Sequence, residues 1–183
     1  MLHDFKNVEY LLKGSLVQQR GWQILQECNV LKKLAAFHAV LTGTLPLDLF
    51  IAGKSDLDIV CFANDLSLFE QIVEHAFASY TAFEITRKNI RATPSVIARF
   101  QYQEFLFELF CQAIPVEKQY AFRHLCIEYS LLQHYGKPLK EQVLQLKQAG
   151  IKTEPAFAQA LGLSGDPYES LLLLDVSTLP PLH

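Results

Sequence analysis

Two aspartates inside an otherwise apolar stretch are the side chains of this sequence whose type and spacing most clearly suit chemistry. Asp56 and Asp58 lie in S-D-L-D-I-V-C-F, residues 55–62, whose apolar and β-branched residues predict a strand. Successive side chains of a strand point to opposite faces, so both carboxylates project from one face and repel each other. A hard cation such as Mg²⁺ takes oxygen ligands and cancels that repulsion, which makes the pair a candidate metal site. Alternatively, Asp56 only caps the turn after Lys54 and Ser55, and Asp58 is solvated at a sheet edge.

A third acid, Glu108, lies in the apolar run F-L-F-E-L-F. An unpaired buried carboxylate costs several kcal/mol or stays protonated, so Glu108 needs a partner. One candidate partner is a metal ion shared with Asp56 and Asp58. The other is Arg99, in a purely structural ion pair.

The Arg99 alternative follows from a predicted hairpin. Residues Ser95–Tyr102 and Phe105–Gln112 are both rich in strand-forming residues, and only two residues separate them. If those two residues form the loop, Arg99 lies directly opposite Glu108, on the same face of the sheet.

The turn Gly43-Thr44 precedes the acidic strand and suits a phosphate. Glycine adopts backbone conformations that other residues resist, and Thr44 offers a hydroxyl and an N–H group. Backbone N–H groups in tight turns bind anions, so we expect Gly43 and Thr44 to be able to cradle a phosphate.

These residues must be positioned by a fold of mixed type. Helical spacing of apolar residues, caps and breakers predict helices, and short apolar or alternating runs predict strands. The expected helices are residues 4–13, 15–27, 65–79, 116–135, 139–149, 154–162 and 167–175, and the expected strands are residues 37–42, 57–62, 83–88, 95–102 and 105–112.

We therefore predict an α+β fold, in which a mixed sheet of four or five strands from residues 37 to 112 is flanked by helices. Residues 1–115 form the core, and residues 116–183 form a helical C-terminal extension packed on it as one structural unit. On the helix that starts near Val116, His124 and Glu128 are expected to be a solvated surface pair, although Leu131 on the same side hints at partial burial.

Composition narrows the functional classes. The chain has 183 residues, half of them hydrophobic, which suffices for a sizeable core, and its net charge of −3 gives no strong signal for nucleic-acid binding. It shows neither a signal-peptide core nor a membrane-spanning stretch, so we expect a cytoplasmic protein. The four cysteines lack metal-site spacing and lie in apolar segments, as buried reduced thiols do.

Taken together, these motifs resemble the polymerase-β-like nucleotidyltransferase superfamily. Its signature is a glycine-containing turn, about a dozen residues, an acid-x-acid pair on a strand and a third acid on a later strand. Here the turn is Gly43-Thr44, the pair is Asp56 and Asp58, and the third acid is Glu108. The full motif G-T-L-P-L-(x)-S-D-L-D-I-V-C, followed later by V-E-K-Q-Y-A-F-R-H-L-C-I-E, resembles a small bacterial family of uncharacterised proteins grouped with these nucleotidyltransferases. The resemblance covers about residues 15 to 135.

The sequence departs from the superfamily pattern at two places. Thr44 stands where Ser or Gly is usual, and Pro46-Leu47 replaces the Arg-Gly that many small members carry after the turn.

The resemblance implies a metal-dependent transfer of a nucleotide from a nucleoside triphosphate to an acceptor hydroxyl. Asp56, Asp58 and Glu108 would be the catalytic residues and would bind Mg²⁺ or Mn²⁺, and Glu108 could also act as general base. The phosphates would lie near Gly43, Thr44, Lys54, Ser55 and Arg99, the last within a basic cluster with Arg87, Lys88 and Arg91. The alternative is a catalytically silent relative that binds a nucleotide or a partner protein.

Overall fold

A computed structural model describes residues 4–179. The described chain forms two compact units, Asp4–Phe122 and the residues from Arg123 onward, and each is described by itself. Their border lies a short way beyond Pro115, where the sequence predicts the change from mixed to helical structure.

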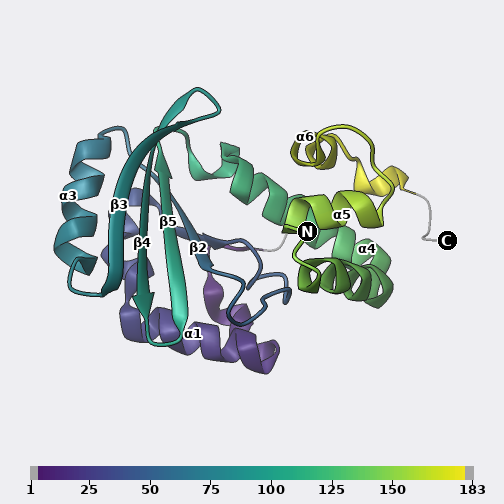
Figure 1. Cartoon of the computed structure of the whole chain (residues 1–183), viewed down its shortest axis with the longest axis horizontal. Helices are drawn as coiled ribbons and strands as arrows, with labels where there is room; N and C mark the ends of the chain where they lie inside the picture. The colour runs from purple at the N-terminus through teal and green to yellow at the C-terminus, as the bar shows by residue number, and fades with distance from the viewer. Residues whose placement is uncertain (1–3, 180–183) are drawn as a thin grey trace. The chain divides into compact units, whose positions relative to one another are not determined.

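The first unit is built on a five-stranded mixed sheet (Figure 1). Its strands, in spatial order, are β1 (Val40–Thr42), β2 (Leu57–Phe62), β5 (Phe105–Gln112), β4 (Thr93–Tyr102) and β3 (Thr81–Ile90). Only β2 and β5 run parallel, and the other neighbours are antiparallel. The predicted α+β architecture is confirmed, with five strands between residues 40 and 112.

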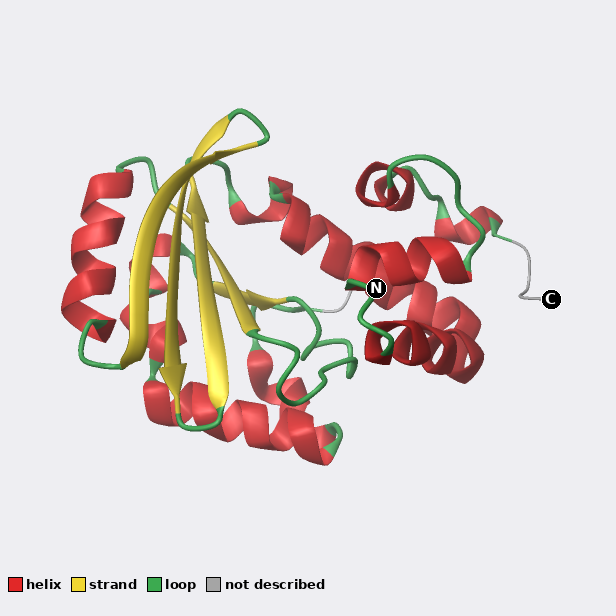
Figure 2. Ribbon diagram, viewed as in Figure 1, coloured by secondary structure: helices red, strands yellow, loops and turns green. Residues whose placement is uncertain are grey.

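Along the chain, helices precede the first strand, separate β2 from β3 and follow β5 (Figure 2). In the first unit they are η1 (Val8–Lys13), α1 (Leu16–Cys28), α2 (Val30–Lys33), η2 (Ala35–Phe37), α3 (Leu66–Phe77) and η3 (Val116–Lys118). Helix α4 (Tyr120–Gln148) leads into the second unit, which also holds α5 (Thr153–Ala160), α6 (Pro167–Leu172) and η4 (Val176–Thr178). Among residues 4–179, no helix is both long and apolar enough to span a membrane.

Local sequence signals account for most of these boundaries. Ser15 forms a capping box with Gln18 at the start of α1, and the Asp65 side chain accepts bonds from the first turn of α3. Gly136 takes a non-helical conformation (φ 63°, ψ −144°), so the helix is interrupted where the sequence predicts a break.

One face of the sheet carries the core of the first unit. Alternate strand residues such as Ile59, Leu109 and Phe100 are fully buried against apolar side chains of α1 and α3. Rings of Phe77, Phe100 and Phe107 stack with centroids 4.8 Å apart at each step. The opposite face therefore remains for the polar residues of the strands.

Two details of the sequence interpretation need correction. The first strand begins at Val40 rather than near Phe37, because Ala35–Phe37 is a 3₁₀ turn and His38 adopts a left-handed conformation (φ 52°) that ends it. The first expected helix is a 3₁₀ helix, Val8–Lys13, which Asn7 caps.

The expectation of a solvated His124–Glu128 pair was wrong, because both side chains are buried. In the second unit, the Nε2 atom of His124 lies 2.8 Å from the carbonyl oxygen of Tyr168, and its Nδ1 lies 3.8 Å from Glu154. Residues of α5 and α6 thus cover this side of α4, where helical spacing alone suggested water.

Candidate active site

Gly43 directly follows β1 and has a backbone φ of 67°, a conformation that favours glycine. A Cβ atom at this position would lie only 1.9 Å from Oδ2 of Asp58. Both the backbone angle and the close approach therefore require glycine, and the absence of a side chain leaves room for the Asp58 carboxylate beside the turn.

The next residue, Thr44, presents an unused hydroxyl. Its side chain is buried, and its Oγ1 atom has no hydrogen-bond partner among residues 4–179, although its carbonyl oxygen accepts a bond from the Leu49 amide at 3.0 Å. A buried hydroxyl without a partner is costly, so this position suits a ligand that would complete the bond.

The loop after the turn is anchored to α1. The buried Gln18 amide donates to the carbonyl oxygens of Leu45 at 2.9 Å and Pro46 at 3.3 Å. The Ser15 hydroxyl bonds to the carboxylate of Asp48, and Gly21 allows close packing of Leu45 on the helix. The loop that replaces the Arg-Gly of the superfamily is therefore held in place by side chains of α1.

Five polar side chains form a row across all strands of the sheet, called the polar row below. The register places Thr42 opposite Asp58, Asp58 beside Glu108, Glu108 opposite Arg99, and Arg99 opposite Glu84. Register partners lie on the same face, so Asp58 and Glu108 share the face away from the core.

Arg99 forms the central ion pair of the polar row. Its Nε atom lies 2.8 Å from Oε2 of Glu108, a second guanidinium nitrogen also bonds that oxygen, and Nη1 lies 3.2 Å from Glu84. The bond with Glu108 raises the pKa of Arg99. The predicted opposition of Arg99 and Glu108 is confirmed, and of the two partners considered for Glu108 the structure shows Arg99.

Asp56 directly precedes β2 rather than lying inside it. Partial burial raises the pKa of its carboxyl group, and the nearby charge of Glu108 raises it further, whereas Arg99 acts in the opposite direction. The Asp56 carboxyl group therefore lies close enough to Glu108 for the two charges to interact.

The residue types fit a hard divalent cation, but the arrangement shown is not a preformed metal site. Within residues 4–179, no three His, Cys, Asp or Glu side chains converge closely enough to hold an ion. Asp58 and Glu108 nevertheless occupy facing positions on adjacent strands, which lie about 4.8 Å apart. Glu108 would have to turn from Arg99 to share an ion with Asp58.

Ser55 and Lys54, two further residues predicted to contact phosphate, belong to the turn that precedes Asp56. The Ser55 hydroxyl accepts a bond from the Ile51 amide at 3.1 Å, so it stabilises the turn before Asp56. Lys54 is exposed in that turn.

Of the basic cluster, Arg87 and Arg91 have other contacts. Arg87 bonds to Glu70 and Ser67 of α3, whereas the Arg91 guanidinium lies 4.1 Å from the ring centre of Tyr120. Arg99 is the residue of that cluster that the register places beside an acid of the predicted site.

Two residues of the site escaped prediction from the sequence. Gln18 looks like an ordinary helix residue, although its place as the fourth residue of a capping box starting at Ser15 is a recognisable signal. Glu84 lies opposite Arg99 because β3 and β4 form a hairpin over Arg91 and Ala92, whose register runs unbroken from Ile90–Thr93 to Glu84–Arg99.

Comparison with protein families gives one match that spans most of the chain. Residues 23–174 match the family described as a domain of unknown function (DUF4269). The chain belongs to this family. No curated protein matches it in sequence.

Solved structures share its fold at low sequence identity. Cid1 poly(U) polymerase with Mg 3′-dATP bound superposes with a TM-score of 0.55 and 16% identity over 90% of this chain and 52% of that chain. The GLD-2/RNP-8 complex gives a TM-score of 0.55 and 14% identity over 93% of this chain and 70% of that one. The polymerase core of TRAMP, an RNA surveillance complex, gives 0.50 and 14% over 86% and 49%.

These similarities confirm the expected nucleotidyltransferase-like fold. They show the fold alone, and this chain spans about half the length of the Cid1 chain bound to MgATP.

Proposed function

We propose that this protein is a metal-dependent nucleotidyltransferase that moves a nucleotide from a nucleoside triphosphate to an acceptor hydroxyl. The observation that carries the proposal is that Gly43 lies against Asp58, whose register partner on the next strand is Glu108. A turn that admits no side chain lies against one carboxylate, and a second carboxylate occupies the facing position on the next strand.

Gly43 and Thr44 would hold the triphosphate. The turn lacks a side chain that would obstruct a phosphate, and the buried Thr44 hydroxyl has no competing partner. Gln18 and Ser15 fix the loop, so little ordering would be required on binding.

Asp56, Asp58 and Glu108 would hold Mg²⁺ or Mn²⁺. Such an ion supplies Lewis-acid stabilisation of the charge that develops on the phosphate oxygens. Among solved structures of this fold, that of Cid1 carries MgATP, which supports this choice of cofactor.

Arg99 and Glu108 would exchange partners when substrate binds. In the structure, Arg99 holds the carboxylate of Glu108. Once released, Glu108 can accept the proton of the acceptor hydroxyl, and Arg99 can bind a phosphate oxygen. The hydroxyl oxygen then bonds to the α-phosphorus, the bond from that phosphorus to the bridging oxygen breaks, and pyrophosphate leaves.

A second candidate function is a silent module that binds a nucleotide or a partner protein without chemistry. The observation that favours it is the engagement of Arg99 by both Glu108 and Glu84. If that arrangement persists with ligand bound, Glu108 stays unavailable to a metal ion.

Turnover separates the two candidates. The protein would be incubated with labelled nucleoside triphosphates, Mg²⁺ or Mn²⁺, and cell extract as a source of acceptor. Transferase activity predicts pyrophosphate release and transfer of label, both lost in Asp58→Asn. Measurable triphosphate binding without release under any of these conditions would support the silent module and refute the transferase.

A further inference from the structure

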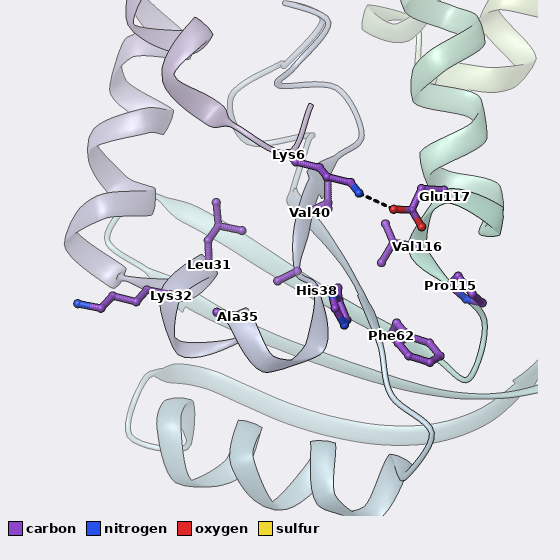
Figure 3. Close-up of a pocket in the computed structure, with 11 residues that line it drawn as sticks. Lys6, Leu31, Lys32, Ala35, His38, Val40, Phe62, Pro115, Val116 and Glu117 are labelled. Carbon is purple, nitrogen blue, oxygen red and sulfur yellow. Dashed lines mark ion pairs between the residues drawn. The ribbon is translucent and has the colours of Figure 1, made fainter. Parts of the chain in front are cut away.

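A pocket in the first unit is lined by residues other than those of the polar row (Figure 3). It has a volume of about 750 Å³, and its lining includes Lys6, Ala35, Val40, Phe62, Val116 and Glu117. Small-molecule sites typically have volumes of about 300 to 1,000 Å³, so this pocket can hold a ligand of one or two rings.

The pocket is separate from the candidate active site. Phe62 lies four residues after Asp58 on β2, about 13 Å along the strand, and Val40 lies two residues before Thr42 on β1, about 7 Å along it. None of its lining residues belongs to the predicted metal or phosphate contacts. A ligand in this pocket would therefore leave Asp58 and Glu108 uncovered.

The walls are mainly apolar and include one aromatic face. Val40 and Val116 are almost fully buried, and Phe62 is half-buried. The rings of Phe62 and His38, which both line the pocket, lie 6.0 Å apart at 44°, so the aromatic side chains of the lining are close together.

One ion pair crosses this region. The Lys6 ammonium lies 2.6 Å from a carboxylate oxygen of Glu117, and their side chains are 60% and 52% exposed. Figure 3 shows this contact between the N-terminal segment and the segment after β5, whereas the Lys32 side chain extends away from it. The bond with Lys6 lowers the pKa of Glu117.

A charged ligand could replace one member of the Lys6–Glu117 pair. The lining holds two cations, Lys6 and Lys32, and one acid, Glu117; because the Lys32 side chain extends away from the pair, its ammonium would reach an entering anion only after a change of rotamer. An anion that enters would compete with Glu117 for the Lys6 ammonium. A cation would have only Glu117 to bind, and Lys6 already occupies it.

We propose that this pocket binds a small aromatic anion, whose ring lies against Phe62 and Val116 and whose carboxylate or phosphate replaces Glu117 as the partner of Lys6.

The test uses 1-naphthyl phosphate, 1-naphthoate and the uncharged 1-naphthol as probes. Two-dimensional NMR of the full chain in EDTA should show shifts at Ala39, Val40 and Val116, with both anions binding more tightly than 1-naphthol. EDTA removes divalent metal, and Asp58→Asn should bind the probes unchanged. Failure here is therefore distinguishable from failure of the proposed transferase.

Two substitutions have opposite expected signs. Lys6→Gln removes the anion's partner and should weaken probe binding about three- to tenfold. Glu117→Gln removes the competitor and should strengthen it by a similar factor. Lys118→Gln makes the same charge change on an exposed neighbour outside the pocket and should change Kd less than twofold.

Occupancy of the pocket itself is tested by Ala35→Trp, which adds a large side chain to an exposed wall position. Binding should be abolished while the melting temperature is retained. Equal effects of Lys6→Gln and Lys118→Gln, weaker binding in Glu117→Gln, or unchanged binding in a folded Ala35→Trp protein would each overturn the proposal.

Discussion

Gly43→Ala tests the close approach on which the candidate site depends. In the structure the added methyl group would lie 1.9 Å from Oδ2 and 2.8 Å from Cγ of Asp58, at a backbone φ of 67°. The left-handed conformation alone costs a non-glycine residue about 1–2 kcal/mol. Displacement of the Asp58 side chain adds about 1–3 kcal/mol, the usual cost of overpacking. We therefore expect Gly43→Ala to lose about 2–5 kcal/mol of unfolding free energy.

Gly53→Ala is the matched control for that substitution. Gly53 has a similar φ of 73°, but a Cβ atom added there would have no neighbour within 4 Å. It should show only the conformational cost, about 1–2 kcal/mol. In an Asp58→Ala background, Gly43→Ala should become cheaper, because the carboxylate is gone and only the Asp58 Cβ, 3.1 Å away, remains.

Urea unfolding of wild type, the three single variants and the double variant, with a common m-value, gives these differences directly. Equal losses for Gly43→Ala and Gly53→Ala, or no change of the Gly43→Ala cost in the Asp58→Ala background, would refute the proposed contact between the turn and the acid.

Three further predictions concern Glu128, Glu108 and Thr44. Burial, with Glu154 nearby, holds the pKa of Glu128 well above its ordinary value. Its folded form is therefore protonated while the unfolded form ionises, so stability falls as pH rises from about 4.3 toward the folded pKa. In that window the unfolding free energy of Glu128→Gln should rise relative to that of wild type by about 1.4 kcal/mol per pH unit. Thermal melts of both proteins from pH 5 to 8 measure this, and a difference that stays constant with pH would contradict it. In EDTA, Glu108→Gln should change stability by no more than about 1 kcal/mol, because the lost ion pair is partly exposed and repulsion of Asp56 is relieved. Mg²⁺ at a hundredfold excess over Kd should stabilise wild type by about 2.7 kcal/mol and this variant much less, whereas a loss of about 3–5 kcal/mol in EDTA with a wild type indifferent to Mg²⁺ would exclude a metal role. Thr44→Val removes a hydroxyl that has no partner among residues 4–179, so thermal melts should show equal or higher stability. Calorimetry should show that the affinity for a triphosphate falls about three- to tenfold, and unchanged affinity would exclude the phosphate contact.

Local patterns were sufficient for the parts of the fold that depend on neighbouring residues. Two residues between Tyr102 and Phe105 fixed the hairpin register, and from it the opposition of Arg99 and Glu108. Cap residues and the break at Gly136 likewise act over a few positions.

Features that depend on distant contacts were not predictable in this way. His124, for example, is buried by helices that follow it much later in the chain. The pocket is lined by segments from four parts of the sequence, and no pattern within any one of them indicates that they come together. Helical and strand periods describe one element at a time, so they do not reveal which polar side another element will cover.

The proposed function requires that Asp56, Asp58 and Glu108 hold a metal ion together with the triphosphate. The most direct measurement is a crystal structure of the protein soaked with Mg²⁺ and a non-hydrolysable nucleoside triphosphate. We predict an ion bound by Asp56 and Asp58, with the Glu108 carboxylate turned from Arg99 toward it and a phosphate oxygen near Gly43 and Thr44. A bound triphosphate with no ion at these aspartates and an intact Arg99–Glu108 pair would contradict the account.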